Sequence, residues 1–362
     1  FHSIIIGTTT AISFFSNSLL IYIVSTTNAD HIGSYRYLLC FFSFCNITTT
    51  IGHVSFEWVC HMTHSGFYFF PRHAGGFVFG VPWASVFCWM FIVTYYQVFL
   101  ILAFHFVYRY KTVTRSGLLL GDGWKKKNWF FTAMIAYLLY VSGFVATVSN
   151  LMAPSEQTRR DVPPEILETY GVDLNDPRTG FLVVAMRRID HSTNQTYWSA
   201  ASVIGMVNHL ILFGGTGAVV VFCIMKTSSA IKSADSQMTP TTKRMQRQLF
   251  RALLIQTTIP MVFSYAPLSF ILFFGGITGE LSLHSRTLSQ SARHFMTAIP
   301  RLNNTIVLFR ARNNQPISDI SLGSFGNVLF IVTAIFPSVD AFFVLFFIVK
   351  FRIAVIKLFR LP

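Results

Sequence analysis

Seven long apolar windows restrict the fold of this sequence more than any other feature. They run approximately over residues 4–25, 37–58, 83–108, 128–152, 200–225, 249–274 and 325–349. A helix that crosses a bilayer needs about 20 predominantly apolar residues. The windows are continuous and lack the two-residue alternation of a barrel strand. They therefore predict an all-α membrane protein built as a single bundle of seven transmembrane helices.

The composition indicates that lipid is the solvent for much of this chain. Hydrophobic residues make up 52% of it, Phe alone contributes 39 residues, and only 12% of the residues are charged. Soluble domains contain roughly 25% charged residues. A soluble domain of this length leaves much of its surface in water and has no room to hide so much apolar area. Composition thus argues against a soluble globular protein.

Basic residues are concentrated in alternate connections between the windows. The segments 109–127 and 226–251, together with the residues after 349, carry every lysine of the chain. The positive-inside rule therefore predicts that these segments and the C-terminus are cytoplasmic and that the N-terminus lies outside. The net charge of +14 then reflects topology and attraction to anionic membrane lipids. Nucleic-acid binding is disfavoured because no separate basic domain exists.

The outer connections contain candidate covalent sites. Asn194 and Asn303 each begin an Asn-X-Thr triplet, which predicts glycosylation. Cys60 and Cys88 are the cysteines nearest the oxidising face, so the sequence leaves open one disulfide between them. The last outer connection, 276–322, is unusually long for a segment without predicted structure, which indicates a functional or a disordered loop.

Four strings carry a resemblance to a known family. They are "IGSYRYLLCFFS" (32–43), "LILAFHFVYRYKTVTR" (100–115), "TTKRMQRQLFRALLIQTTIP" (241–260) and "FPSVDAFFVLFFIVKFRIAVIKLF" (336–359). Together they resemble the nematode serpentine chemoreceptors of the Str and Srj class. The resemblance covers the chain outside 276–322 and implies a plasma-membrane receptor of sensory-neuron cilia. Such a receptor binds a small-molecule odorant, activates a heterotrimeric G protein and needs no cofactor.

The sequence departs from that family in three places. Family members usually have a short final outer connection, so the atypically long segment 276–322 has the character of an insert. The seventh span of this sequence has Ala341 after the acid, where the family usually has Pro. Its second outer connection contains no cysteine, so the disulfide common in rhodopsin-like receptors cannot form there.

A cluster of aromatic and basic residues at the inner end of the third span is a candidate coupling site. The resemblance places Arg109 at the arginine of the acid-Arg-Tyr motif of rhodopsin-like receptors, with Tyr110 after it. Tyr108 replaces the acid, so some other contact must hold the resting state. The alternative is that these residues only anchor the helix at the membrane interface.

Basic residues before the sixth span form a second candidate contact surface. Lys243, Arg247 and Arg251 share one face of a helix. This face would suit a G protein or anionic lipid, although a topology signal alone explains the same charges. Pro260 and Pro267 inside the span predict a bent helix.

Asp340 is an acid within an otherwise apolar window. Intramembrane acids usually face the bundle interior and are hydrogen-bonded, and Asn17 and Asn46 are the natural partners. The resemblance places Asp340 at the polar residue of the seventh-helix proline motif, with Pro337 as the nearby bend. We predict a conformational switch network; a purely structural polar pair is the alternative.

The ligand pocket is expected between spans three, five, six and seven, where receptors of this architecture open outward. An apolar, Phe-rich lining suits a small, volatile or apolar odorant. The candidate lining residues are Trp89, Thr94, Gln97, Asn208, His209 and Tyr265.

Two other functions compete with the receptor. His53, Glu57, His61 and His64 would share one helical face at the outer end of span two, which is typical of a zinc site in a membrane metal hydrolase. A transporter is the third possibility, but the windows show no inverted repeat. We predict a receptor, not an enzyme, and no bound metal.

Overall fold

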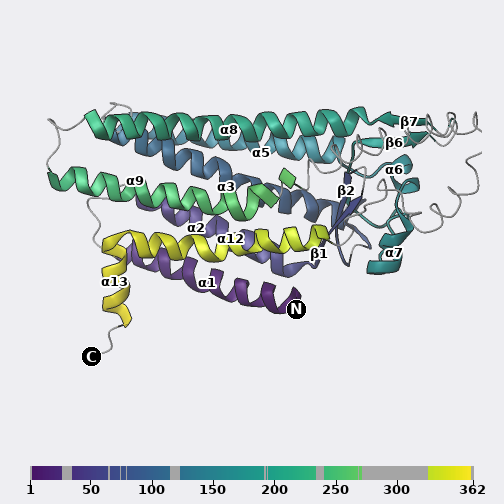
Figure 1. The fold of residues 1–362 in the computed structure, drawn as a ribbon, viewed down its shortest axis with the longest axis horizontal. Helices are drawn as coiled ribbons and strands as arrows, with labels where there is room; N and C mark the ends of the chain where they lie inside the picture. The colour runs from purple at the N-terminus through teal and green to yellow at the C-terminus, as the bar shows by residue number, and fades with distance from the viewer. Residues whose placement is uncertain are drawn as a thin grey trace, which may run out of the picture.

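Seven long helices lie side by side in the computed structural model (Figure 1). The structure describes residues 2–26, 35–63, 66–73, 75–78, 80–114, 123–190, 193, 195–233, 240–267, 269–270 and 325–359. Within these residues the long helices are α1 (His2–Thr26), α2 (Tyr35–Ser55), α3 (Trp83–Val113), α5 (Gly123–Leu151), α8 (Ala200–Ser233), α9 (Pro240–Pro260) and α12 (Phe325–Phe347).

The helices follow the apolar windows, with differences at their ends. Six of them, all except α9, are long and apolar enough to cross a membrane within the part of the chain that the structure describes. Helix α9 begins at Pro240, before the predicted window, because its first half is the basic segment. After Pro260 it continues as the π-helix η2 (Met261–Tyr265), as expected where a proline interrupts helical hydrogen bonding. Helix α2 ends at Ser55 and not at Trp58.

Helix α3 is the centre of the bundle. It packs against α2, α5, α8 and α9, and the run from Tyr95 to Ala103 is buried on all sides. A helix that is apolar all round must be surrounded by protein or lipid. Helix α3 runs between the two ends of the bundle. It contains residues of both the predicted ligand pocket and the predicted coupling site.

A small sheet covers one end of the bundle. Strands β1 (Trp58–Thr63), β2 (Gly66–Pro71) and β5 (Leu182–Ala185) form an antiparallel sheet in that order. The short helices α6 (Glu156–Arg160) and α7 (Pro164–Tyr170) lie beside it (Figure 1). Two hairpins lie at the same end, β3–β4 (Phe77–Val78 and Val81–Pro82) and β6–β7 (Arg187–Asp190 and Gln195–Trp198). We call the sheet with α6 and α7 the cap.

The cap sheet is buried on both faces. Cys60, Phe69 and Val184 belong to the hydrophobic cluster that contains α3, α5 and α8 side chains. The alternate residues, such as Tyr68 and Val183, pack instead with Ile166 of α7 in a second cluster. Alternation of side chains along a strand places each set on its own face. The cap is therefore a packed layer that closes the bundle.

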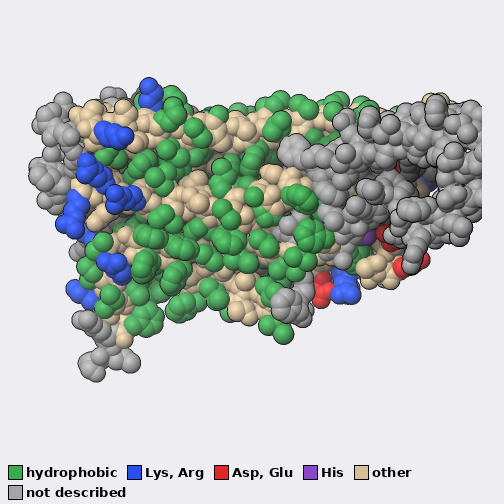
Figure 2. All heavy atoms as spheres, viewed as in Figure 1, with side chains coloured by type: hydrophobic (Ala, Val, Ile, Leu, Met, Phe, Trp, Pro, Cys, Tyr) green, Lys and Arg blue, Asp and Glu red, His purple; other side chains and the backbone are tan. Residues whose placement is uncertain are grey.

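The opposite end carries the positive charge. Figure 2 shows hydrophobic side chains along the length of the bundle and most of the visible Lys and Arg side chains gathered at one end, whereas basic and acidic groups lie together at the capped end. This basic end is where α3 and α8 finish and α9 begins. Helix α13 (Val349–Phe359) turns there, across the bundle (Figure 1). Because α1 begins at the capped end and α13 lies at the basic end, the described chain starts and finishes at opposite ends.

Candidate functional site

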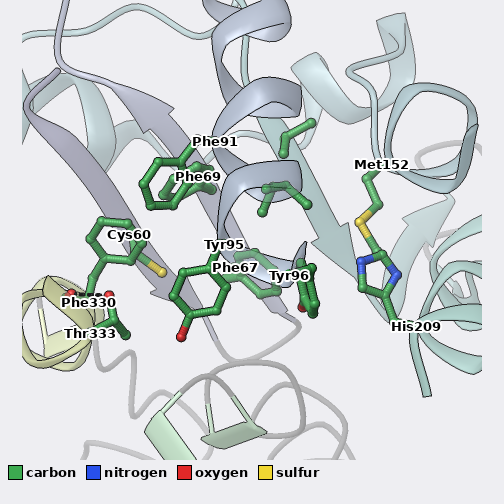
Figure 3. Close-up of a pocket in the computed structure, with 12 residues that line it drawn as sticks. Cys60, Phe67, Phe69, Phe91, Tyr95, Tyr96, Met152, His209, Phe330 and Thr333 are labelled. Atoms are coloured by element: carbon green, nitrogen blue, oxygen red, sulfur yellow. Dashed lines mark hydrogen bonds between the residues drawn. The ribbon is translucent and has the colours of Figure 1, made fainter. Parts of the chain in front are cut away.

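An aromatic cavity lies directly beneath the cap (Figure 3). It has about 640 Å³ of space free of protein atoms, part of it open to the outside. Its wall combines rings of α3, including Phe91 and Tyr95, with Phe67 and Phe69 of the cap. His209 of α8 and Thr333 of α12 add polar atoms to this wall. Such a mostly apolar space with few polar groups is typical of a small-molecule site.

Hydrogen bonds fasten the cap to the first turn of α12. The backbone N–H of Cys60 donates to Oδ1 of Asn327 at 2.7 Å. The Asn327 amide donates in turn to the hydroxyl of Tyr170 in α7 at 3.2 Å. Asn327 thus joins the sheet, α7 and α12, and it fixes the roof of the cavity relative to the helices.

Gly326 allows this close approach. A Cβ added there would lie 2.3 Å from the carbonyl oxygen of Cys60, so backbone would have to move. We expect Gly326→Ala to lower stability by about 1–3 kcal/mol, the usual cost of overpacking, measured by thermal unfolding of purified protein. Gly214→Ala in α8 is the control, because nothing lies within 4 Å of the added atom. Equal melting temperatures for both variants would contradict this role for Gly326.

The cysteines near the cap form no disulfide. Cys60 and Cys88 are both free and buried, so the disulfide left open by the sequence is absent. Cys88 instead lies 3.9 Å from the carbonyl oxygen of Phe69. Burial raises the pKa of the Cys60 thiol to about 12, so it stays protonated and unreactive near neutral pH.

Asp340 is the centre of a polar cluster in the middle of the bundle. Its Oδ2 accepts hydrogen bonds from Asn46 at 3.2 Å and from Gln256 at 3.4 Å. The Asn46 amide also lies 3.3 Å from Oδ1 of Asn17. Asn17 donates to the carbonyl oxygen of Pro337 at 2.9 Å. The cluster therefore connects α1, α2, α9 and α12 through side chains that are almost completely buried.

Arg109 is buried at the basic end, with 3% of its surface exposed. Its guanidinium carbon lies 3.9 Å from the centre of the Tyr35 ring, over its face. The Tyr35 hydroxyl is 2.9 Å from Nδ1 of His105, and its ring stacks on Tyr108. Among the described residues Nε and Nη2 of Arg109 have no hydrogen-bond partner. The face of the Tyr35 ring thus covers the guanidinium of Arg109 in a cation–π contact.

The metal constellation of the alternative hydrolase hypothesis does not form among the described residues. Helix α2 ends at Ser55, so Glu57 and His61 are not on its face, and His64 lies outside the described residues. His53 packs between Phe91 and Phe330, whereas exposed Glu57 pairs with Arg72. Within the described ranges no cluster of His, Cys, Asp and Glu has metal-binding geometry. This alternative hypothesis was wrong because it continued helix α2 into what is strand β1.

Comparison with known proteins identifies the family. The family model for the serpentine type 7TM GPCR chemoreceptor Str matches residues 2–300. The chain belongs to this family. Two curated Caenorhabditis elegans relatives are similar over most of their length. Serpentine receptor class J-38 is 27% identical over 272 residues, 71% of this chain and 74% of the relative. G-protein coupled receptor str-33 is 23% identical over 276 residues, 74% of this chain and 76% of the relative.

The fold of the receptor agrees with that assignment. The crystal structure of squid rhodopsin matches with a TM-score of 0.55 at 10% sequence identity, covering 98% of this chain and 83% of the rhodopsin chain. The protein is therefore a seven-helix, multi-pass G-protein-coupled chemosensory receptor. The comparisons do not support the metal hydrolase or transporter alternatives, and the predicted resemblance is confirmed.

The six predicted ligand residues of the receptor are spread over several environments. His209 lines the cavity, whereas Tyr265 packs edge-on to Phe99 and is not among the described lining residues. Gln97 accepts a hydrogen bond from Tyr137 at 2.6 Å, and Asn208 donates to Thr147. Thr94 bonds within α3, to the carbonyl oxygen of Phe91. Trp89 is half-buried against the main hydrophobic cluster.

The predicted coupling residues are mostly at the basic end. Tyr110 packs edge-on against Phe222 of α8. Arg247 and Arg251 are exposed on α9, which also contains Lys243. The glycosylation candidates Asn194 and Asn303, and the long connection 276–322, lie outside the described residues.

Sequence reasoning missed the contribution of the cap to the cavity. Cys60, Phe67, Phe69 and Leu182 line it, yet all four lie between the predicted spans. The sequence does contain a signal for the cap in two separate runs, the aromatic run Phe67–Phe70 and the apolar run 181–186. Both runs are too apolar for exposed loops.

Proposed function

We propose that this receptor binds a small apolar odorant in the cavity beneath the cap and activates a heterotrimeric G protein at the basic end. The observation that carries the proposal is the placement of the two sites on one helix. Helix α3 contributes Phe91, Tyr95 and Tyr96 to the cavity and holds buried Arg109 near its other end. A ligand that moves α3 or its neighbours would change the surroundings of Arg109.

The charge distribution supports one orientation in the membrane. The basic end would face the cytoplasm, in agreement with the positive-inside rule, and the cap would lie outside. We propose the plasma membrane of a sensory-neuron cilium as the location, and Asn194 and Asn303 as glycan sites on the outer face. Lys243, Arg247 and Arg251 would meet the G protein or anionic lipid headgroups.

The polar cluster around Asp340 is proposed as the switch between the two sites. It includes residues of four helices, and Asp340 Oδ1 has no partner among the described residues. A cluster with an unused acceptor can exchange partners when helices shift, since buried polar networks have discrete arrangements. Pro337 and the π-helix after Pro260 supply nearby places where the backbone can bend.

The proposed function is tested by nucleotide exchange on a G protein with the receptor in lipid nanodiscs. An odorant panel should stimulate exchange in the wild type. Arg109→Ala should reduce the stimulated rate at least about tenfold, because loss of one buried charged contact at an interface costs about 2 kcal/mol or more. Arg36→Ala is the matched control, since Arg36 is an exposed arginine that stacks on the neighbouring Tyr37 ring and donates a hydrogen bond to its hydroxyl. Unchanged exchange in Arg109→Ala would overturn the coupling role.

A further inference from the structure

The cavity wall contains few groups that can choose between ligands by hydrogen bonding. In Figure 3 Tyr95 and Tyr96 lie between Cys60, Phe330 and Thr333 on one side and His209 on the other. The rest of the wall is aromatic and aliphatic. Such a surface accepts many apolar molecules of suitable size. Polar discrimination must therefore come from the few heteroatoms that face the space.

His209 has a fixed hydrogen-bonding polarity. Its Nδ1 lies 3.0 Å from the carbonyl oxygen of Gly205, one turn earlier in α8. A carbonyl oxygen only accepts, so Nδ1 must carry the proton of a neutral imidazole. The other nitrogen, Nε2, is then an acceptor. It has no hydrogen-bond partner among the residues that the structure describes, although only 4% of the His209 surface is exposed.

The surroundings favour the neutral ring. Tyr96 and Phe144 pack edge-on against His209, at 5.4 and 5.0 Å between ring centres. None of the twelve described residues that line the cavity is acidic. A charged imidazole without a counter-ion is costly in such a place, so His209 does not offer two donors to a ligand.

The remaining polar groups do not reverse this polarity. The Thr333 hydroxyl donates to the carbonyl oxygen of Phe330 at 2.6 Å, which leaves its oxygen as an acceptor. The hydroxyls of Tyr95 and Tyr96 can donate or accept, so they do not select between ligand types. The wall thus has an obligate acceptor at His209 and no obligate donor among its twelve lining residues.

We propose that the cavity selects small apolar ligands with one hydrogen-bond donor, alcohols or phenols, whose hydroxyl donates to Nε2 of His209. The inference rests on the proposed function and specifies the ligand class of the same site. Ketones and ethers of equal size have only acceptors to offer. In the cavity they would leave Nε2 without a partner and bring a second acceptor towards it.

Isomeric probes test the proposal by direct binding. Benzyl alcohol and anisole have the same atoms, as do 1-hexanol and methyl pentyl ether, and 2-hexanone represents the ketones. Dissociation constants come from the shift in thermal unfolding of the purified receptor in nanodiscs over a concentration series. Each alcohol should bind about tenfold more tightly than its ether, the value of one neutral hydrogen bond.

Variants connect the preference to His209. His209→Leu should weaken alcohol binding about tenfold and leave ether binding unchanged. His209→Gln retains an acceptor and adds a donor, so it should keep alcohol binding and gain 2-hexanone. His53→Leu is the matched control, because His53 is equally buried and touches Phe91 and Phe330 but does not line the cavity. It should preserve the wild-type preference.

The outcomes separate this inference from the proposed function. Equal binding of isomers by the wild type, an equal loss of both in His209→Leu, or no binding of any alcohol would overturn the inference. None of these results uses a G protein. Alcohol-selective binding without stimulated nucleotide exchange would instead overturn the coupling role while supporting the ligand class.

Discussion

Asp340→Leu is expected to lower the stability of the receptor by roughly 2–4 kcal/mol, at about 1–2 kcal/mol for each buried amide left without its acceptor. Asn46 and Gln256 both donate to the same Asp340 oxygen. Leucine branches at Cγ as aspartate does, but it has methyl groups in place of the carboxylate oxygens and therefore no acceptor. The loss should appear as a lower melting temperature of the purified receptor in detergent and a lower yield of folded protein.

Asp340→Asn is the matched variant for that experiment. Its carbonyl oxygen can accept from both amides, so its stability should lie within about 1 kcal/mol of the wild type. Phe342→Leu, at a position with 58% of its surface exposed, controls for a change on the lipid side of the same helix. If Asp340→Leu and Asp340→Asn had equal melting temperatures, the hydrogen bonds to Asp340 would contribute little to stability. The cluster could then not stabilise one conformation of the bundle over another.

The polar cluster was largely predictable because lipid leaves few choices for an acid. Asp340, Asn17 and Asn46 are buried polar residues in three apolar windows, and such residues turn inward towards each other. The structure brings these three together as expected. Gln256 was not predicted to join the cluster. It lies close to the polar first half of α9, so the sequence alone did not indicate that its amide is buried.

The helical spans were also predictable, whereas the cap was not. A continuous run of about twenty apolar residues forms a helix in a bilayer, because only a helix satisfies all its backbone hydrogen bonds within the segment. The cap depends on pairing between β2 and β5, for example Phe69 with Leu182, which are far apart in the chain. Its sheet is buried on both faces, so the strands lack a clear alternation of polar and apolar residues. The same local ambiguity led the metal hypothesis to extend α2 through His61.

Ligand residues were the least predictable part of the site. Spans three and five carry apolar residues on every side, so periodicity does not show which face points inward. Of the six candidates only His209 reached the cavity wall. Gln97 and Asn208 have polar partners on α5 instead, which polar residues between transmembrane helices commonly do.

Tyr35→Leu is expected to raise nucleotide exchange in the absence of ligand by up to about thirtyfold. In the structure Arg109 is held under the Tyr35 ring and is not available to a partner protein. A desolvated cation–π contact contributes about 2 kcal/mol, and loss of that amount changes the ratio of two states about thirtyfold. If the contact stabilises the resting state, its removal shifts the population towards the coupling-competent state.

Tyr35→Phe separates the ring from the hydroxyl. Phenylalanine retains the face that covers Arg109 and loses only the hydrogen bond to His105, so basal exchange should stay within a few-fold of the wild type. Rates are compared per folded receptor, and the double variant Tyr35→Leu with Arg109→Ala should return to low exchange because the released arginine is the group that couples. A Tyr35→Leu receptor with wild-type basal exchange would mean that the ring merely packs against Arg109, and the restraint on this receptor would have to come from contacts other than the tyrosine that faces its arginine.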